Sequence, residues 1–175
     1  HDLLVISDEI YAELTYGGRH VSIASLPGMK ERTVLINGFS KAFAMTGWRI
    51  GFVCAPPELD AALFKIHQYA IMCAPGASQY AAIEGLKDGF TDNFAVVESM
   101  REEYDKRRRF MTRFFNENGL PCFEPRGAFY VYPSTAALGV TGEEFANGLL
   151  RAEKVAAVPG DAFGEAGRYH VRCSY

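Results

Sequence analysis

Three short, wholly apolar segments constrain the fold of this chain most. They are LLVIS at residues 3–7, TVLI at 33–36 and IGFVC at 50–54. Strands that are apolar on both sides, instead of alternating, are typical of a sheet with a layer on each face. The sequence therefore predicts an α/β protein in which these three strands lie inside a sheet covered on both faces.

Helices are predicted next along the chain. The first enters through Pro56 and Pro57, and a second follows the break at Pro75-Gly76, with Ser78 as its expected N-cap. A long pattern from about residue 92 runs to Asn118-Gly119, a typical helix end. Its length predicts a helix that bridges two lobes.

The last third of the chain predicts a smaller α/β lobe. Its expected elements are strands at 122–124, 128–133, 155–158 and 168–174 and a helix near 142–152. Both chain ends run directly into apolar, strand-like sequence. We therefore expect the chain to be a piece of a longer protein.

Composition excludes some classes of partner. The chain has 175 residues, of which 49% are hydrophobic and 22% charged, and its net charge of −3 shows no basic excess for nucleic acid. No apolar stretch is long enough to cross a bilayer. The arginine-rich stretch 101–113 is interleaved with acidic residues, which indicates a solvated helix face.

The cysteines and histidines suggest no metal site. Four cysteines without a CxxC pair predict reduced, mostly buried thiols in a cytoplasmic protein, with neither a disulfide framework nor a zinc site. His20, His67 and His170 have no partner at a useful spacing along the chain.

The segment GFSKAFAMTGWRIGF, residues 38–52, contains only two charges, Lys41 and Arg49. Lys41 follows a predicted strand at the sheet edge where ligand crevices form in α/β proteins. Partial desolvation there makes an amine a nucleophile towards carbonyls, and an arginine fork suits a phosphate or carboxylate. A surface lysine with a structural arginine explains this stretch equally well.

Asp8 and Tyr11 shift that balance because they follow the first strand to the same edge. Asp8 alternatively caps the turn into EIYAEL. A lysine, an arginine, an aspartate and a tyrosine at strand ends are the set that pyridoxal phosphate needs. They supply an amine for its aldehyde, a cation for its phosphate, a carboxylate for its ring nitrogen and a donor for its phenolic oxygen.

The segments SDEIY, NGFSKAFAMTGWRIGF, GAFYVYP, VPGDAFG and YHVRCSY occur here in the order and spacing of a known family. They resemble the class I and II aminotransferases of the fold-type-I pyridoxal-phosphate enzymes. The resemblance implies that residues 1–94 are the C-terminal half of the cofactor-binding large domain, with a mixed, mostly parallel sheet. It implies that residues 95–175 are the small C-terminal α/β domain, entered through the long helix and truncated at its end.

The resemblance also implies the roles of the cofactor residues. Lys41 forms the internal aldimine and later moves the proton between the substrate Cα and the cofactor C4′. Asp8 pairs with the pyridine nitrogen and Tyr11 bonds the phenolic oxygen. Ser40 and Arg49 hold the phosphate.

Arg172, in YHVRCSY, matches the arginine that grips the α-carboxylate of the substrate. Strand alternation places His170, Arg172 and Ser174 on one face, with Val171 packing behind. Without the resemblance, a structural ion pair would be the better interpretation of Arg172.

Two departures from the family pattern stand out. Some relatives carry serine at the position of Gly38, so that one side-chain phosphate contact is absent here or replaced by the backbone. The family's glycine-rich phosphate loop, ring-stacking aromatic and asparagine are expected before residue 1.

These observations predict a cytoplasmic, homodimeric, pyridoxal-phosphate-dependent aminotransferase with no metal, nucleic-acid or membrane partner. It would exchange amino groups between an amino acid and a 2-oxo acid by a ping-pong mechanism. The stretch 65–84 resembles the subgroup acting on aspartate and aromatic amino acids. One alternative is a C–S β-lyase with the same cofactor. Another is the non-catalytic effector domain of a transcription regulator, which a winged helix-turn-helix domain upstream would reveal.

Overall fold

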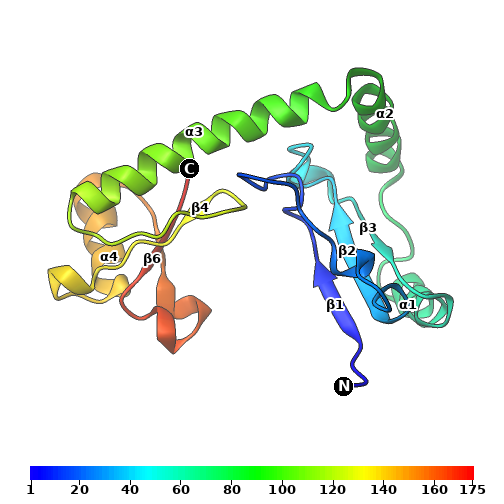
Figure 1. Ribbon diagram of the computed structural model, residues 1–175, viewed down its shortest axis with the longest axis horizontal. Helices are drawn as coiled ribbons and strands as arrows, with labels where there is room; N and C mark the ends of the chain where they lie inside the picture. Colours follow the sequence, from blue (N-terminus) through cyan, green and yellow to red (C-terminus); the bar gives the residue numbers. More distant parts are fainter. The chain divides into compact units, whose positions relative to one another are not determined.

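The computed structural model describes residues 1–175, and the chain divides into two compact units, His1–Ser99 and Met100–Tyr175. The boundary falls within the long helix α3, Ala95–Glu117, which confirms the long helix expected there (Figure 1). The proposed assignment of residues 1–94 and 95–175 to a large and a small domain stays a prediction.

The first unit contains a three-stranded sheet in the order β1-β2-β3 (Figure 1). Its strands are β1 (Val5–Asp8), β2 (Thr33–Gly38) and β3 (Gly51–Cys54). β1 and β2 run parallel, whereas β3 runs antiparallel to β2. The sheet is therefore mixed, as predicted. The ends of β1 and β2 and the start of β3 all lie at one edge.

The prediction that these strands are covered on both faces is wrong within this chain. Ile6 on β1 remains 75% exposed and Phe52 on β3 45% exposed, and every residue of β3 is exposed. No element of the 175 residues covers these side chains. Uncovered apolar faces of this kind favour association with further protein surface.

The two helices of the first unit are α1 (Pro57–Ala70) and α2 (Gly76–Asp92). α1 is entered through proline, as predicted, but α2 begins directly after Pro75, so that Ser78 is not its N-cap. It lies in the first helical turn, buried, where its hydroxyl donates a hydrogen bond of 2.5 Å to the Trp48 carbonyl. The Ser78 side chain, which the local sequence predicts to cap α2, is thus used in a tertiary hydrogen bond instead.

A small apolar core lies where α2 meets the loop after β2. It is formed by Phe39, Met45 and Ala82, with Phe43, Ile50 and Leu86 packed against it. Because most of these residues flank Lys41 in sequence, the core fixes the loop that carries this lysine.

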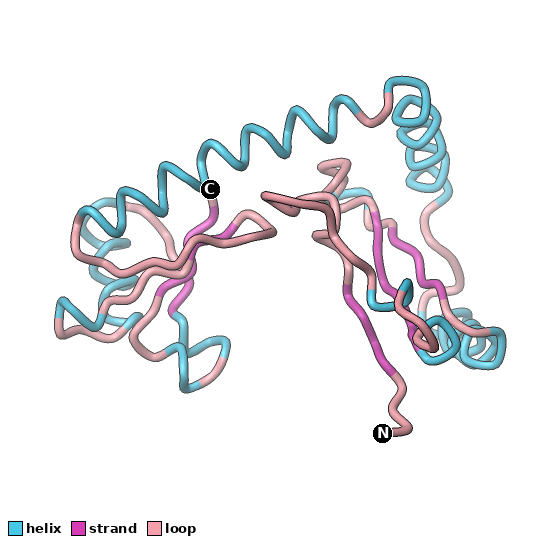
Figure 2. The backbone as a smooth tube through the Cα atoms, viewed as in Figure 1, coloured by secondary structure: helices cyan, strands magenta, loops and turns pink.

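The second unit holds a small antiparallel sheet in the order β4-β6-β5, and Figure 2 shows its strands as short magenta segments. They are β4 (Tyr130–Val131), β6 (Val171–Ser174) and β5 (Val158–Pro159). Helix α4 (Gly142–Glu153) begins with a capping box between Thr141 and Glu144. The predicted lobe of short strands and one helix is therefore present.

Six short 3₁₀ helices complete the secondary structure. They are η1 (Ile23–Ser25), η2 (Lys30–Arg32), η3 (Thr46–Trp48), η4 (Ala136–Leu138), η5 (Gly160–Phe163) and η6 (Glu165–Gly167). No helix of the chain combines the length and the apolar character that a membrane span requires.

The strand predicted at residues 122–124 is absent, and Asn116 explains why. The Asn116 side chain donates to the Cys122 carbonyl at 2.8 Å and accepts from the Cys122 N–H at 3.0 Å. The Asn116 amide thus forms hydrogen bonds with both the N–H and the carbonyl of Cys122, which a neighbouring strand would otherwise bind. The end of α3 is as predicted, with Gly119 at a φ of +76°.

Two further predictions need correction. The arginine-rich face of α3 is mostly solvated, but Arg108 is buried and binds Asp105, Glu124 and the Pro125 carbonyl. The free cysteines are not mostly buried. Cys54 and Cys73 are exposed, whereas Cys173 is half-buried and Cys122 buried. Both corrections follow from tertiary packing, which the local pattern of charges and cysteines does not show.

Candidate active site

Five of the predicted site residues lie at one edge of the first unit's sheet. Asp8 ends β1, Lys41 follows β2, and Arg49 stands two residues before β3. The Nζ atom of Lys41 lies 5.5 Å from the centroid of the Tyr11 ring. The loops that follow the two parallel strands therefore meet at this edge, as the sequence predicts.

The loop from Phe39 to Ile50 is tightly built. The N–H groups of Phe43 and Met45 both donate to the Phe39 carbonyl, at 3.2 and 3.3 Å, and Phe39 N–H donates to Ile50 O at 3.3 Å. Ala42 is buried directly beside Lys41. Lys41 itself is half-buried. Its position is fixed on both sides by buried neighbours.

Arg49 and Ser40 are the predicted phosphate contacts. Arg49 has a left-handed backbone, with φ 52° and ψ 52°, which is uncommon for a residue other than glycine. Its Nη1 donates to the Thr46 carbonyl at 2.7 Å, which holds an otherwise exposed guanidinium in place. The Ser40 hydroxyl is half-buried and makes no hydrogen bond within the chain. Both side chains retain donors for an anion.

Gly38 lies where β2 and β3 approach each other closely. A Cβ atom at Gly38 would lie 2.8 Å from the Gly51 Cα and 3.0 Å from the Ile50 carbonyl oxygen. The strands β2 and β3 approach each other too closely for a side chain here without a backbone shift. Glycine at this position therefore follows from the close pairing of β2 with β3.

Asp8 lies exposed at the sheet edge. Its Oδ1 accepts a hydrogen bond of 3.2 Å from the Ile10 N–H. The alternative that Asp8 caps the turn into EIYAEL is therefore realised, and the residues directly after β1 form turns. The second carboxylate oxygen forms no hydrogen bond within the chain, so the cap leaves Asp8 able to bind a further donor.

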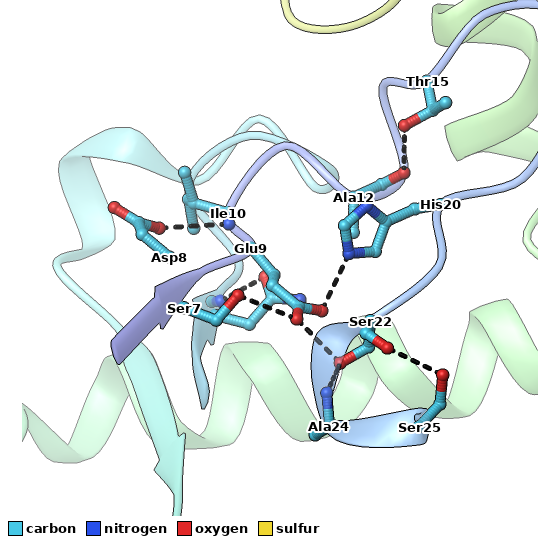
Figure 3. Close-up of polar contacts among 12 residues, drawn as sticks. Ser7, Asp8, Glu9, Ile10, Ala12, Thr15, His20, Ser22, Ala24 and Ser25 are labelled. Carbon is cyan, nitrogen blue, oxygen red and sulfur yellow. Dashed lines mark hydrogen bonds and ion pairs between the residues drawn. The ribbon is translucent and has the colours of Figure 1, made fainter. Parts of the chain in front are cut away.

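Glu9 is the residue of this region that sequence reasoning missed. It is only 6% exposed, and its carboxylate accepts hydrogen bonds from Ser7, Ser22 and His20 at 3.1, 2.7 and 2.9 Å (Figure 3). The prediction that His20 has no partner is therefore wrong. Its partner stands eleven residues away across a loop, and no local spacing rule indicates this contact.

The ionisation of Glu9 follows from these contacts. Burial by itself raises the pKa of the Glu9 carboxyl, but hydrogen bonds from Ser22, His20 and Ser7 outweigh burial and hold the pKa below its ordinary 4.5. Glu9 is thus a buried carboxylate at neutral pH, and an ionised carboxylate only accepts hydrogen bonds. The nearby His20 Nε2 therefore carries the proton in this contact.

Arg172 lies in the second unit beside a cavity of about 590 Å³. Its guanidinium carbon stands 4.4 Å from the Tyr130 ring centroid and 4.6 Å from that of Phe163. No carboxylate of the chain pairs with Arg172, so Arg172 does not form the structural ion pair that was the alternative interpretation. The cavity is lined by Phe123, Pro125, Arg126, Gly127, Tyr130, Tyr132, Phe163, Ala166, Gly167 and Arg172.

The strand pattern around Arg172 is as predicted. Val171 is fully buried and Arg172 half-buried. The ring of His170 stacks on Tyr132 with centroids 4.8 Å apart and planes 6° apart, so His170 does have an aromatic partner. Arginine held between aromatic rings keeps its donors directed to a ligand. This cavity is suited to binding an anion beside apolar groups.

The residues at the sheet edge fit the chemistry of pyridoxal phosphate. They provide one amine, one carboxylate with an unused oxygen, two donors for a phosphate and a tyrosine beside the amine. The structure brings Lys41 and Tyr11 together and places Asp8, Ser40 and Arg49 at the same edge. Arg172 belongs to the other unit. The role of each residue stays a prediction.

Comparison with known proteins identifies the family. The model of aminotransferase class I and II matches residues 1–175. The chain is 57% identical to the putative aminotransferase YugH of Bacillus subtilis, and 49% identical to an aspartate aminotransferase of Pyrococcus abyssi. Both alignments cover all of this chain, and they cover 44% of the Bacillus protein and 45% of the Pyrococcus protein.

Solved structures agree with this. The crystal structure of an aromatic aminotransferase from Pyrococcus horikoshii matches with a TM-score of 0.93 at 49% identity, covering 100% of this chain and 46% of that one. The predicted fold class is thereby confirmed. The chain spans about half the length of these relatives. It belongs to the class I and II aminotransferase family.

Proposed function

We propose that this chain is part of a pyridoxal-phosphate-dependent aminotransferase, in which it supplies the lysine that carries the cofactor. One observation carries the proposal. A half-buried lysine at the edge of an α/β sheet stands beside Tyr11, in a loop fixed by buried neighbours. The family of the chain supports it.

The residues at the sheet edge have complementary roles in this proposal. The cofactor, when bound, supplies an electron sink for the bond broken at the substrate Cα. Lys41 would hold the cofactor at its aldehyde carbon through Nζ, and the same amine, once displaced by the substrate amine, would move the proton at the substrate Cα. Asp8 holds the protonated ring nitrogen, Tyr11 donates to the phenolic oxygen, and Ser40 and Arg49 bind the phosphate.

Arg172 binds the α-carboxylate of the substrate in this proposal. Its guanidinium is flanked by Tyr130 and Phe163 and has no carboxylate partner in the chain. A planar fork that is already oriented loses little side-chain entropy on binding a carboxylate. The aromatic lining of the cavity suits the apolar part of an amino acid.

We propose aspartate or aromatic amino acids as the amino donors and 2-oxo acids as acceptors, in a ping-pong reaction. Support comes from the relatives, which include enzymes named for aspartate and for aromatic amino acids. The proposal includes a cytoplasmic homodimer. The four free cysteines are consistent with a reducing compartment.

An assay of the full-length protein tests this function. With aspartate or an aromatic amino acid plus 2-oxoglutarate, we expect formation of glutamate, because the second half of a ping-pong transamination returns the amino group to the oxo acid. Cystathionine should release little pyruvate or ammonia. Efficient pyruvate release without glutamate would favour the β-lyase instead. Cofactor binding without turnover of either substrate would favour the regulator domain.

A further inference from the structure

Glu9 lies in sequence between Asp8 and Tyr11, two residues of the proposed cofactor site, but its side chain points to the opposite side of the backbone from that of Asp8. Successive residues at a strand end point to opposite faces. Asp8 is exposed at the sheet edge, whereas Glu9 is buried. The Glu9 side chain is therefore placed to act on the site through the backbone and not by contact with a ligand.

The Glu9 carboxylate ties a separate loop to the end of β1. Ser22 and His20 come from the segment before η1, and Ser7 comes from β1 itself (Figure 3). Ser22 also caps η1 by accepting from the Ala24 N–H at 3.3 Å. All of these contacts converge on one buried negative charge. Leaving a buried carboxylate without its hydrogen-bond donors would destabilise this part of the fold.

The backbone of Glu9 continues this anchoring into the site. Its N–H donates to the Ile36 carbonyl at 2.8 Å, and its carbonyl accepts from the Ala12 N–H at 2.9 Å. The turn closed by that second bond contains Tyr11, whose ring lies 5.5 Å from the Lys41 Nζ. A displacement of Glu9 thus moves both neighbours that face the cofactor.

We propose that Glu9 is a positioning residue: its carboxylate, held by Ser7, His20 and Ser22, fixes Asp8 and Tyr11 in the orientation that binds pyridoxal phosphate. This inference rests on the proposed function. Glu9 does not touch the cofactor or the substrate. Its effect is exerted on the two residues that do.

Two variants of the full-length protein isolate this role. Glu9→Gln keeps the shape of the side chain but removes its charge and turns one acceptor oxygen into a donor, so that at least one of the three groups that now donate to Glu9 has to accept instead. Ser22→Ala removes one donor to the Glu9 carboxylate, together with the side-chain cap of η1, and keeps the charge. Thr141→Ala is the matched control, because it breaks the capping box of α4 in the other unit and tests general loss of stability.

Equilibrium dialysis should show pyridoxal phosphate binding about tenfold weaker in Glu9→Gln and about threefold weaker in Ser22→Ala. The pH midpoint of the bound cofactor's visible absorbance should move upward in both variants. If Asp8 holds the ring nitrogen less firmly, that nitrogen is protonated to a smaller extent. The weaker positive charge on the ring then repels a proton on the Lys41 nitrogen less, so the pKa of that nitrogen rises. Thr141→Ala should lower the melting temperature and leave affinity and midpoint unchanged.

The outcomes separate this inference from the proposed function. If the wild type binds pyridoxal phosphate and both variants keep its affinity and its pH midpoint, the positioning role of Glu9 is wrong but the proposed function stands. A wild type that binds no cofactor would overturn both proposals. If Glu9→Gln does not fold, Ser22→Ala decides: its weaker binding and raised midpoint support the role, and wild-type values refute it.

Discussion

The Lys41→Ala variant of the full-length protein should lose transamination by a factor of about 10⁴ or more, together with the visible absorbance of the bound cofactor. Alanine provides neither the covalent attachment nor the proton transfer at the substrate Cα. The fold should persist, because the buried neighbours Phe39, Ala42 and Met45 anchor the loop without the lysine. Activity assays and absorbance spectra of the purified variant measure both effects.

A second lysine serves as the control for this variant. Lys65 is exposed on α1. Lys65→Ala should retain activity and absorbance, since a loss common to both variants would reflect damage to the fold. A covalent link to the cofactor that borohydride still reduces in Lys41→Ala would refute the assignment of Lys41.

Arg172→Ala should mainly raise the KM for the amino acid, by roughly 30- to 900-fold, corresponding to about 2–4 kcal/mol for the loss of a charge-assisted pair. The cofactor should stay bound. Arg49→Ala should have the complementary effect, with weaker cofactor retention, because its guanidinium is assigned to the phosphate. Steady-state kinetics and cofactor titration of the two variants separate these effects.

An arginine outside both regions provides the matched control. Arg151 is exposed in the last turn of α4. Its replacement by alanine should change neither the KM nor cofactor retention. If Arg172→Ala instead released the cofactor while Arg49→Ala raised only the KM, the two arginines would have exchanged roles and the present assignment would be wrong.

Features governed by local sequence were predictable. The apolar runs locate β1, β2 and β3, and parallel pairing of the first two brings Asp8 and Lys41 to one edge. Asn118-Gly119 ends α3 because glycine adopts a positive φ at no steric cost. The placement of Lys41 near Tyr11 follows from this topology.

Contacts between distant segments were not predictable from spacing. The Glu9–His20 pair crosses a loop, and Ser78 reaches back thirty residues to Trp48 instead of capping α2. Asn116 replaces a neighbouring strand at Cys122 through its side chain. The first two contacts join segments that only the tertiary fold brings within reach, and the third depends on how the chain turns back after α3, so no simple residue spacing reveals them.

The exposure of the strands has a different origin. Residues such as Ile6 and Phe52 have the composition of a buried sheet, yet no element of this chain covers them. Composition predicts the environment that a strand requires and not which segment provides it. The chain spans about half the length of the relatives that it matches.

Covalent labelling shows directly whether Lys41 carries the cofactor. The full-length protein is loaded with pyridoxal phosphate, reduced with borohydride, digested and analysed by peptide mass spectrometry. We expect the mass of the reduced cofactor on Lys41, within the peptide that contains SKAFAMTGWR. Labelling of another lysine such as Lys65 or Lys87 with Lys41 unmodified, or no stable label at all, would contradict it.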